Sequence, residues 1–460
     1  MKPRRLFLWT AVLLTVVASI AVALTAIAWN SLAARDAEWS HHVRFTFAGH
    51  TLEQDASMAV LLRAATHPLA ARLIDGRSLA TAQGRWHLSA RPDGSVAARC
   101  EPCRFALPAL GPTPLAVERA VLVLHNDGAD RYRGTLQLGK QPSITLEGRA
   151  EFDRSGQLDI NAKLPPTPIG DAVQVLGRDL PERTTVQIKG TLAFTVSAKS
   201  QHGPWRIKPV VDGFEVAGLG TERLADTQRP AACRVDAQPS VPAIGGWLPR
   251  AVIAAEDARF AEHPGYDLQA LSDALEHNQK PGAAIAGAST LTQQLAKLVV
   301  AGDERSASRK LRELLYAVEM ERTLGKARIL QLYLALAPWG DGVCGAERAV
   351  RVHLGQRDAS AVGPVAAAWL ASLLPAPDAT LKSEQAALEI DQARVARVIA
   401  GMRPMSPERR EKAQVALLFW SPPALTRLRE AAAPAREALP KDSAATATPS
   451  LETPPVAPSP

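Results

Sequence analysis

The sequence predicts a multidomain fold: an N-terminal transmembrane helix, a β-rich extracytoplasmic domain, and then a mainly α-helical domain. Three observations support this order. Residues 6–29 are uncharged and mostly apolar, residues 36–230 hold short alternating runs, and residues 240–400 hold longer runs with helical spacing. A chain of 460 residues is long enough for about two to three domains.

The N-terminal segment is predicted to be a membrane anchor. It is long enough to span a bilayer, which takes roughly 20 apolar residues. Basic residues at its start, and none again until Arg35, place the N-terminus in the cytoplasm and the rest outside. Two Ala-x-Ala triplets within it, at 21–23 and 26–28, fit the alternative of a cleaved signal peptide. We favour the anchor because the apolar run exceeds the usual signal-peptide core of about 7 to 15 residues.

Residues 36–230 are predicted to form a β-rich domain, in which one helix at Leu52–Leu73 precedes the strands. Turn residues such as Asn126-Asp127-Gly128 separate the alternating runs. The predicted strands are Trp86–Ala90, Ala120–Leu124, Gly134–Leu138, Ile144–Gly148, Gln157–Ile160, Val186–Val196 and Trp205–Val211.

Composition narrows the possible partners. The formal net charge is +7, but the basic residues are dispersed and no aromatic-basic platform accompanies them, so no nucleic-acid partner is expected. Anionic lipid headgroups and pyrophosphates fit this charge better. The four cysteines allow three pairings, one of which joins Cys100 to Cys103 and Cys233 to Cys344. A cysteine metal site is not expected, because no second Cys-x-x-Cys is present.

Residues beyond the helical domain are predicted to form an extension and a tail. Helical spacing continues at Ala387–Met402 and Pro407–Leu418, which gives a helical extension over 401–432. Residues 433–460 are rich in Ala, Pro, Ser and Thr, a composition typical of disorder.

A first polar cluster follows residue 255. The sequence predicts a helix over Pro249–Glu262 that is ended by His263-Pro264-Gly265. Val252, Glu256 and Phe260 would then share one face, which places Glu256 within an apolar stripe. Loss of solvation would raise the pKa of its carboxyl and suit it to act as a general base. The alternative is a glutamate that only pairs with an arginine.

A second cluster marks a helix start. Thr290-Leu291-Thr292-Gln293 fits a capping box, so a helix is predicted to begin at about Thr290. Gln293, Gln294 and Lys297 would lie within one turn of each other. Free backbone N–H groups, the hydroxyls of Ser289 and Thr290 and a nearby lysine could bind a phosphate, whereas the alternative is an ordinary capped surface helix.

A third segment, Arg305–Arg322, has an apolar stripe formed by Leu311, Leu314, Leu315 and Val318. The opposite side carries charged side chains, and Arg309 and Glu313 form an i,i+4 pair. Alone, this pattern is typical of a solvated ion-pair face. Together with the first two clusters it suggests that the cations bind a pyrophosphate leaving group. The charged residues are Arg309, Lys310, Arg312 and Glu313.

These segments together resemble the glycosyltransferase module of peptidoglycan polymerases. That family includes class A penicillin-binding proteins and monofunctional biosynthetic transglycosylases. The resemblance covers roughly residues 240–400. Its motifs are Glu-Asp-x-x-Phe-x-x-His-x-Gly at 256–265, Gly-x-Ser-Thr-Leu-Thr-Gln-Gln at 287–294, Arg-Lys-x-x-Glu at 309–313, Lys-x-x-Ile-Leu-x-x-Tyr-Leu at 326–334 and a Gly-rich stretch at 339–347.

The resemblance implies a lysozyme-like, mainly helical domain that polymerises lipid II into glycan strands by an inverting displacement. Glu256 would deprotonate the 4-hydroxyl of the acceptor sugar, and Glu313 would help to steady the pyrophosphate of the donor, with Mg²⁺ or Mn²⁺ as an optional ligand. No organic cofactor is implied. The remaining residues implied in substrate binding are Asp257, Phe260, His263, Ser289, Thr290, Gln293, Gln294, Lys297, Arg305, Arg309 and Lys310.

Two positions depart from the family pattern. Ala335 stands where the family usually carries Asn, and residues 349–355 lack the usual two aromatics. These changes put acceptor positioning and local packing in question. The chain also contains no Ser-x-x-Lys or Lys-Thr-Gly, so a penicillin-binding transpeptidase domain is not expected and cross-linking would fall to a separate protein.

Two alternatives remain at the level of the sequence. A lytic hydrolase would use Glu256 as a general acid, but glycan cleavage has no pyrophosphate for the Arg-Lys-x-x-Glu cluster to neutralise. A non-catalytic envelope scaffold would keep a degenerate module and use residues 36–230 for binding. The Gly-x-Leu-x-Leu cadence of this region resembles lipid-handling β-groove proteins, and the alternative is a spacer that sets the height of the module above the inner membrane.

Overall fold

The structure is a computed structural model, which describes residues 40–47, 50–106, 112–153, 157–199, 205–226, 245–280, 282, 286–301 and 306–437. The predicted anchor and most of the predicted tail lie outside these residues. No helix within the described part of the chain is long and apolar enough to cross a membrane. The chain divides into two compact units, which we call the sheet unit (Met1–Pro230 and Arg259–Tyr333) and the helical unit (Ala231–Ala258 and Leu334–Pro460).

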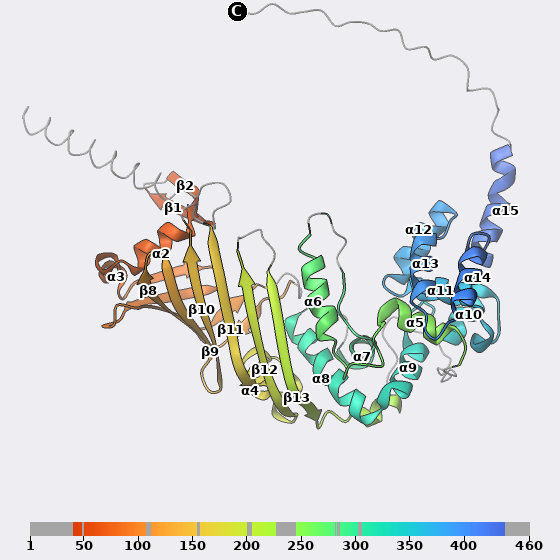
Figure 1. The fold of residues 1–460 in the computed structure, drawn as a ribbon, viewed down its shortest axis with the longest axis horizontal. Helices are drawn as coiled ribbons and strands as arrows, with labels where there is room; N and C mark the ends of the chain where they lie inside the picture. Colours follow the sequence, from red (N-terminus) through yellow and green to blue (C-terminus); the bar gives the residue numbers. More distant parts are fainter. Residues whose placement is uncertain are drawn as a thin grey trace, which may run out of the picture. The chain divides into compact units, whose positions relative to one another are not determined.

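A long antiparallel sheet dominates the sheet unit (Figure 1). Within the described residues it has nine strands in the order β13-β12-β11-β10-β9-β8-β5-β4-β3. The predicted strands are confirmed, and most extend beyond the predicted bounds. The strands are β3 (Ser78–Thr81), β4 (Gly84–Ala90), β5 (Val96–Cys100), β8 (Ala120–Gly128), β9 (Arg131–Gly139), β10 (Ser143–Phe152), β11 (Leu158–Pro168), β12 (Gln187–Ala198) and β13 (Arg206–Ala217).

Two helices cover the apolar face of this sheet. Ala172 and Val175 of α4 (Ile169–Leu176) belong to one core cluster with Ile144 of β10. Ala59 of α2 (Met58–Thr66) packs with Tyr132 at the opposite end of the strands. Because side chains alternate across a strand, the intervening residues of β9 to β13 form a second face, and most of these are polar.

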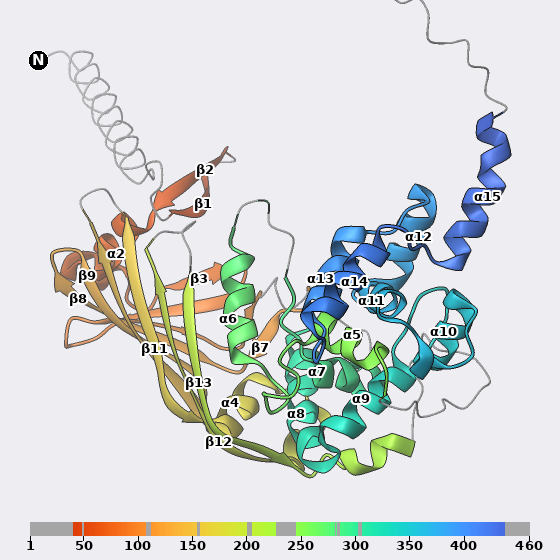
Figure 2. The same ribbon diagram turned by 45° about the vertical axis from the view of Figure 1, so that its right-hand side comes forward.

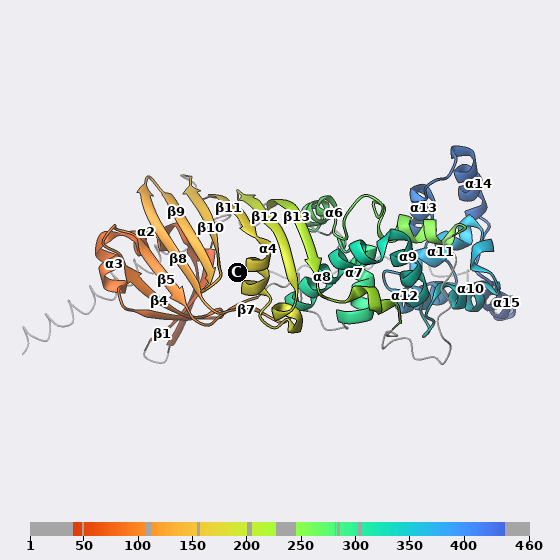
Figure 3. The same ribbon diagram turned by 90° about the horizontal axis from the view of Figure 1, so that it is seen from below.

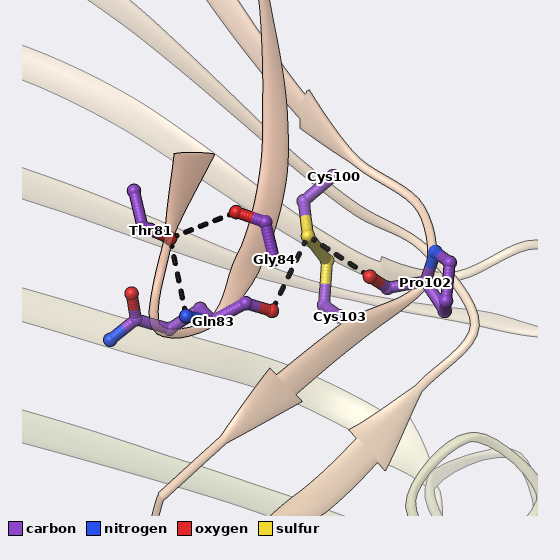
Figure 4. Close-up of a disulfide and its surroundings, with 6 residues drawn as sticks. All are labelled: Thr81, Gln83, Gly84, Cys100, Pro102 and Cys103. Atoms are coloured by element: carbon purple, nitrogen blue, oxygen red, sulfur yellow. Dashed lines mark hydrogen bonds between the residues drawn. A yellow bond between two sulfur atoms is a disulfide. The ribbon is translucent and has the colours of Figure 1, made fainter. Parts of the chain in front are cut away.

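A disulfide closes the turn between two sheets (Figure 4). Cys100 ends β5 and Cys103 begins β6 (Cys103–Phe105), which pairs with β7 (Leu115–Val117). Both cysteines are fully buried, and the predicted local pairing is confirmed. Gly84 lies against this bridge with φ +135°, and a Cβ there would come within 2.9 Å of the Cys100 Sγ, so no side chain fits. Cys233, the predicted partner of Cys344, lies outside the described residues.

The sheet shares a core with α8 (Ala307–Thr323), which runs beside β13 (Figures 2 and 3). Leu315 and Val318 of α8 are buried with Val173 of α4 and Val216 of β13. Leu315 and Val318 both belong to the apolar stripe predicted from the sequence, and that prediction is confirmed. The β-rich region and this helix therefore fold around common apolar contacts rather than as separate bodies.

Hydrogen bonds and an ion pair also join the β-rich region to α8. The carboxylate of Glu319, 1% exposed, accepts hydrogen bonds from the backbone N–H of Leu219 at 3.0 Å and of Thr221 at 3.4 Å. Glu182 pairs with Arg312 and accepts a hydrogen bond from the Tyr316 hydroxyl at 3.0 Å. Burial, reinforced by the Glu182 charge, raises the pKa of Tyr316 to about 12, so its hydroxyl stays a donor.

Further helices complete the sheet unit. In this unit α6 (Leu268–His277) lies beside β13, and α7 (Leu291–Ala296) packs on α8. The first turns of α9 (Gly325–Leu336) also belong here, whereas its last residues belong to the helical unit. Short elements at the two ends of the sheet are β1 (Ser40–Phe47), β2 (His50–Ser57), α3 (Pro68–Ile74) and the 3-10 turns η2 (Pro181–Thr184) and η3 (Thr221–Asp226).

The helical unit is built around α11, whose ten residues include nine buried ones. Trp339 and Trp369 are its largest fully buried side chains. The predicted helices of the extension correspond to α13 and α14. The described helices of this unit are α5 (Leu248–Glu256), α10 (Ala346–Leu354), η5 (Ala359–Ala361), α11 (Pro364–Leu373), α12 (Pro377–Ala387), α13 (Gln392–Gly401), α14 (Pro407–Leu417) and α15 (Pro423–Glu437).

Two predicted helices are wrong in their bounds. The predicted helix Leu52–Leu73 is a strand, β2, followed by two helices that break at His67, because Pro68 lacks the N–H that would continue the first one. The predicted helix Pro249–Glu262 ends at Glu256, since Asp257 adopts an extended φ of −160°. Phe260 is therefore not on the same helix as Glu256.

Replacement of Glu319 tests the joint between sheet and helix. Glu319→Ala should lower the free energy of unfolding by about 2 kcal/mol, because two backbone N–H groups, one buried and one partly buried, lose a charged acceptor. Glu215→Ala is the matched control, since Glu215 is exposed and pairs with Lys189 at 3.4 Å. The control should change stability by less than about 0.5 kcal/mol in urea unfolding. Equal effects of the two variants would contradict the assigned role.

Candidate active site

The start of α8 gathers two cationic side chains around one buried carboxylate. Ser306 caps the helix by accepting a hydrogen bond from the Arg309 N–H at 3.1 Å. One turn later, Glu313 is 1% exposed and its two oxygens bind Arg309 and, at 2.7 Å, Lys310. A solvated ion-pair face, the interpretation of this stretch taken alone, is therefore wrong for Glu313. Arg309 and Lys310 are held in place by a carboxylate that water cannot reach.

Lys310 also connects α8 to the predicted second cluster. Its Nζ lies 2.6 Å from the hydroxyl oxygen of Ser289, and about a third of its side chain stays exposed. The structure thus brings Ser289, Arg309, Lys310 and Glu313 into one hydrogen-bonded cluster. An anion that reached this cluster would meet a lysine and a hydroxyl whose positions are already fixed.

The predicted capping box at Thr290 is confirmed. The Thr290 hydroxyl accepts from the Gln293 N–H, and the Gln293 side chain accepts from the Thr290 N–H. The same hydroxyl donates to the carbonyl of Gly265 at 2.7 Å, so its bonding capacity is used within the protein. In this structure Thr290 and Gln293 shape the helix start and the turn at Gly265 rather than present free groups to a ligand.

The second half of the first motif packs against α8 and α9. Phe260 and His263 are both buried, and their rings meet edge to face. The Lys326 Nζ lies 4.5 Å from the centre of the Phe260 ring and donates to the His263 carbonyl at 2.6 Å. Gly265 has φ +93°, and a Cβ there would come within 2.9 Å of the Ala317 carbonyl oxygen. Phe260 and His263 therefore contribute to the packing of this region in the structure.

Two residues in this region were missed in the sequence. Glu321 accepts hydrogen bonds from the Thr292 hydroxyl at 2.5 Å and from Lys326 at 2.9 Å, which joins the second motif to the fourth. Tyr333 donates to the Gln294 side chain at 2.8 Å. Tyr333 and Lys326 stand in a recognisable motif, but no local spacing indicates Glu321. Lys297, with an exposed side chain, follows the last residue of α7 and begins the π-helical turn η4 (Lys297–Ala301), and Arg305 lies outside the described residues.

Glu256 and Asp257 belong to the helical unit, whose boundary falls after Ala258. Glu256 is the last residue of α5 and is half-buried, while Asp257 is 9% exposed. The same helix buries Ala251 and Val252 completely. On α5, the residues that precede Glu256 therefore provide part of the predicted apolar neighbourhood.

The two departures from the family pattern both lie in packed positions of the helical unit. Ala335 is 6% exposed, and a Cβ on Gly345 would come within 2.8 Å of its carbonyl oxygen. His353, within the altered stretch, is buried in contact with the Trp369 ring, and its Nε2 lies 3.1 Å from the Trp339 carbonyl. This stretch therefore packs without the two aromatics.

The side chains that the structure describes around Glu313 do not offer a metal ion a free set of ligands. Both Glu313 oxygens bind cationic side chains, and no group of three or more His, Cys, Asp or Glu side chains that could hold a metal ion occurs among the described residues. We therefore assign no step to a protein-bound divalent cation.

Comparison with known proteins supports this assignment of motifs. The sequence profile of the transglycosylase family matches residues 232–403. The match is to this part of the chain, which is therefore similar in sequence to that family. Proteins named "Biosynthetic peptidoglycan transglycosylase" are similar to part of the chain: 44% identical over 135 residues in Alcanivorax borkumensis, 45% over 134 in Nitrosomonas eutropha and 46% over 140 in Cupriavidus pinatubonensis.

The similarity covers only part of this chain and only part of each relative. It covers 29% of this chain and 55% of the Alcanivorax protein, 29% and 54% for Nitrosomonas, and 30% and 55% for Cupriavidus. The chain thus spans about half the length of these relatives. The nine-stranded sheet lies before the transglycosylase-family residues in the chain, although it shares a core with their helix α8.

The buried histidine predicts a pH effect on stability. Burial lowers the pKa of His353 below its usual 6.5 despite the hydrogen bond to Trp339. As the pH falls through 6.5, the unfolded chain takes up a proton that the folded chain does not, so stability falls. The melting temperature of the wild type should therefore drop between pH 7 and 5 more than that of His353→Gln. Parallel curves for the two proteins would contradict this assignment.

Proposed function

We propose that the chain is a membrane-anchored peptidoglycan glycosyltransferase that polymerises lipid II into glycan strands and releases undecaprenyl pyrophosphate. The partners would be lipid II, the growing strand, the inner membrane and a separate transpeptidase. Residues 1–35 would anchor the chain, with the catalytic domain on the periplasmic side.

Protease digestion of intact spheroplasts should then cleave the chain, whereas protection from the protease would contradict this topology. Covalent labelling by penicillin would contradict the absence of transpeptidase activity.

The observation that carries the proposal is the buried Glu313 with its two cations. Such a carboxylate costs desolvation energy that a plain helix does not require. Its effect is to hold Arg309 and Lys310 side by side, and Lys310 also reaches Ser289 at 2.6 Å. A departing pyrophosphate develops negative charge, so fixed cations stabilise it more in the transition state than in the ground state.

The proposed reaction is one displacement. Glu256 takes the proton from the 4-hydroxyl of the acceptor sugar, and that oxygen bonds to the anomeric carbon of the donor. The bond from this carbon to the pyrophosphate oxygen breaks with its electron pair, and the anomeric configuration inverts. Arg309 and Lys310, with Lys297, neutralise the leaving group. The names of the similar proteins support a role in peptidoglycan synthesis.

Glu256→Gln tests the proposed base. The amide keeps the size of the side chain but cannot accept the proton, so the initial rate of polymerisation of labelled lipid II should fall at least about 100-fold. The melting temperature should stay close to that of the wild type. Glu262→Gln, in the same motif but on an exposed side chain, is the control and should stay within twofold. A Glu256→Gln rate above about a tenth of wild type would rule out the base assignment.

Lys310→Gln tests the proposed clamp. Glu313 keeps its bond to Arg309 in this variant, so the fold should persist while turnover falls about 100-fold or more. The matched control is Lys412→Gln, which removes an exposed i,i+4 pair with Glu408 and should leave turnover within twofold. Both rates are measured with saturating lipid II. A loss for Lys310→Gln no larger than that of the control would support a purely structural pair.

A further inference from the structure

The polar face of the large sheet contains a cationic hollow, which the transglycosylase assignment does not use. It is an open cavity of about 730 Å³ over β8 to β13, with His125 as its lining residue on β8. Its lining includes five cationic side chains and one carboxylate, Glu147. The cations are Arg133, Arg149, Lys163, Arg206 and Lys208.

Three of these cations have no anionic partner in the described structure. Lys163 pairs with Glu147 at 3.0 Å, and Arg133 pairs with Asp127 at 2.6 Å. Arg149, Arg206 and Lys208 form no ion pair or side-chain hydrogen bond within the described residues, and all three are exposed. The hollow therefore carries uncompensated positive charge that an anionic ligand would neutralise.

The spacing of the cations indicates an elongated ligand. They stand on β9, β10, β11 and β13, and strands lie about 4.8 Å apart, so the row spans roughly 19 Å. A single phosphate could not reach both ends. The lining also includes Ala162 and Val196, but most of its uncharged side chains can form hydrogen bonds, and it has no Trp, Tyr, Phe or Leu of the kind typical of a membrane-binding surface. Four of the hydrogen-bonding side chains lie between the cations. They are Thr135, Asn161, Thr195 and Ser197.

The hollow continues toward the transglycosylase-family residues. A second groove of about 400 Å³ shares Arg206 and Lys208 with it and is lined on its other side by α6. The side chain of Gln279, just after α6, hydrogen-bonds both the N–H and, at 2.8 Å, the carbonyl of Trp205 before β13. This fixes the sheet edge against α6, which follows the Glu256 motif in the chain.

We propose that this hollow binds the nascent, uncross-linked glycan strand through the free carboxylates of its peptide stems. The inference rests on the proposed function, because that reaction produces such a strand. A strand bears repeated carboxylates along its length and sugar hydroxyls between them, which matches a row of cations interleaved with Thr, Ser and Asn. Binding of the product on the sheet would keep the growing strand near the enzyme between additions.

The test measures strand binding separately from polymerisation. End-labelled, soluble, uncross-linked strands are titrated with the full chain carrying Glu256→Gln in detergent, and anisotropy gives Kd. Arg149→Gln, Arg206→Gln and Lys208→Gln combined should weaken binding at least tenfold, while the corresponding lysine variant, Arg149→Lys with Arg206→Lys, should bind nearly as well as the parent. Binding should also weaken as salt rises.

A matched control removes three exposed cations that do not line the hollow, from β4, β5 and β6: Arg85→Gln, Arg99→Gln and Arg104→Gln combined should stay within twofold. Strands stripped of their peptide stems should bind at least tenfold more weakly to the parent. Unchanged Kd in the hollow variant, or equal binding of stripped strands, would overturn the proposal. The proposal would also be overturned if the hollow variant bound strands like the parent and lost only its affinity for vesicles of anionic phospholipid. Polymerisation by the chain with Glu256 intact is assayed in parallel, so loss of the proposed function would be recognised separately.

Discussion

The structure depends above all on the placement of helix α8, which carries a buried carboxylate on each of two sides. Glu313 and Glu319 are each 1% exposed. Glu313 binds Arg309 and Lys310, and Glu319 accepts two backbone N–H groups at the end of the sheet. Removal of either carboxylate leaves buried or partly buried partners without their acceptor, so the helix has one favourable position and orientation. The position of the helix therefore also sets the positions of Arg309 and Lys310 near its start.

This arrangement makes the β-rich region a support for α8. Its strands β12 and β13 and its helix α4 supply the apolar partners of Leu315 and Val318, and Glu182 supplies the partner of Arg312. The opposite face of α8 contacts α7 and the turn at Gly265, whose glycine permits close approach to Ala317. The proposed clamp would benefit from such support, because a displacement of about 1 Å in a positioned group can cost a large part of its effect on rate.

The sequence predicted what local patterns specify. The capping box at Thr290, the apolar stripe of α8 and the alternating strands all depend on residues close in the chain, and the structure confirms them. The burial of Glu313 and the bonds of Glu319 and Glu321 were not predicted, because their partners come from distant segments. The end of α5 at Glu256 was also missed, since helical spacing continued past a residue whose backbone is extended. Helical pattern alone cannot detect that change.

The central claim is that α8 and the edge of the sheet form one cooperative unit. Native-state hydrogen exchange of the full chain measures this directly, because each amide reports the free energy of the opening that exposes it. The account predicts that the buried amides of α8 and those of β13 open with the same free energy and respond equally to low concentrations of denaturant. Opening of α8 at a free energy several kcal/mol below that of β13, with a smaller response to denaturant, would contradict it.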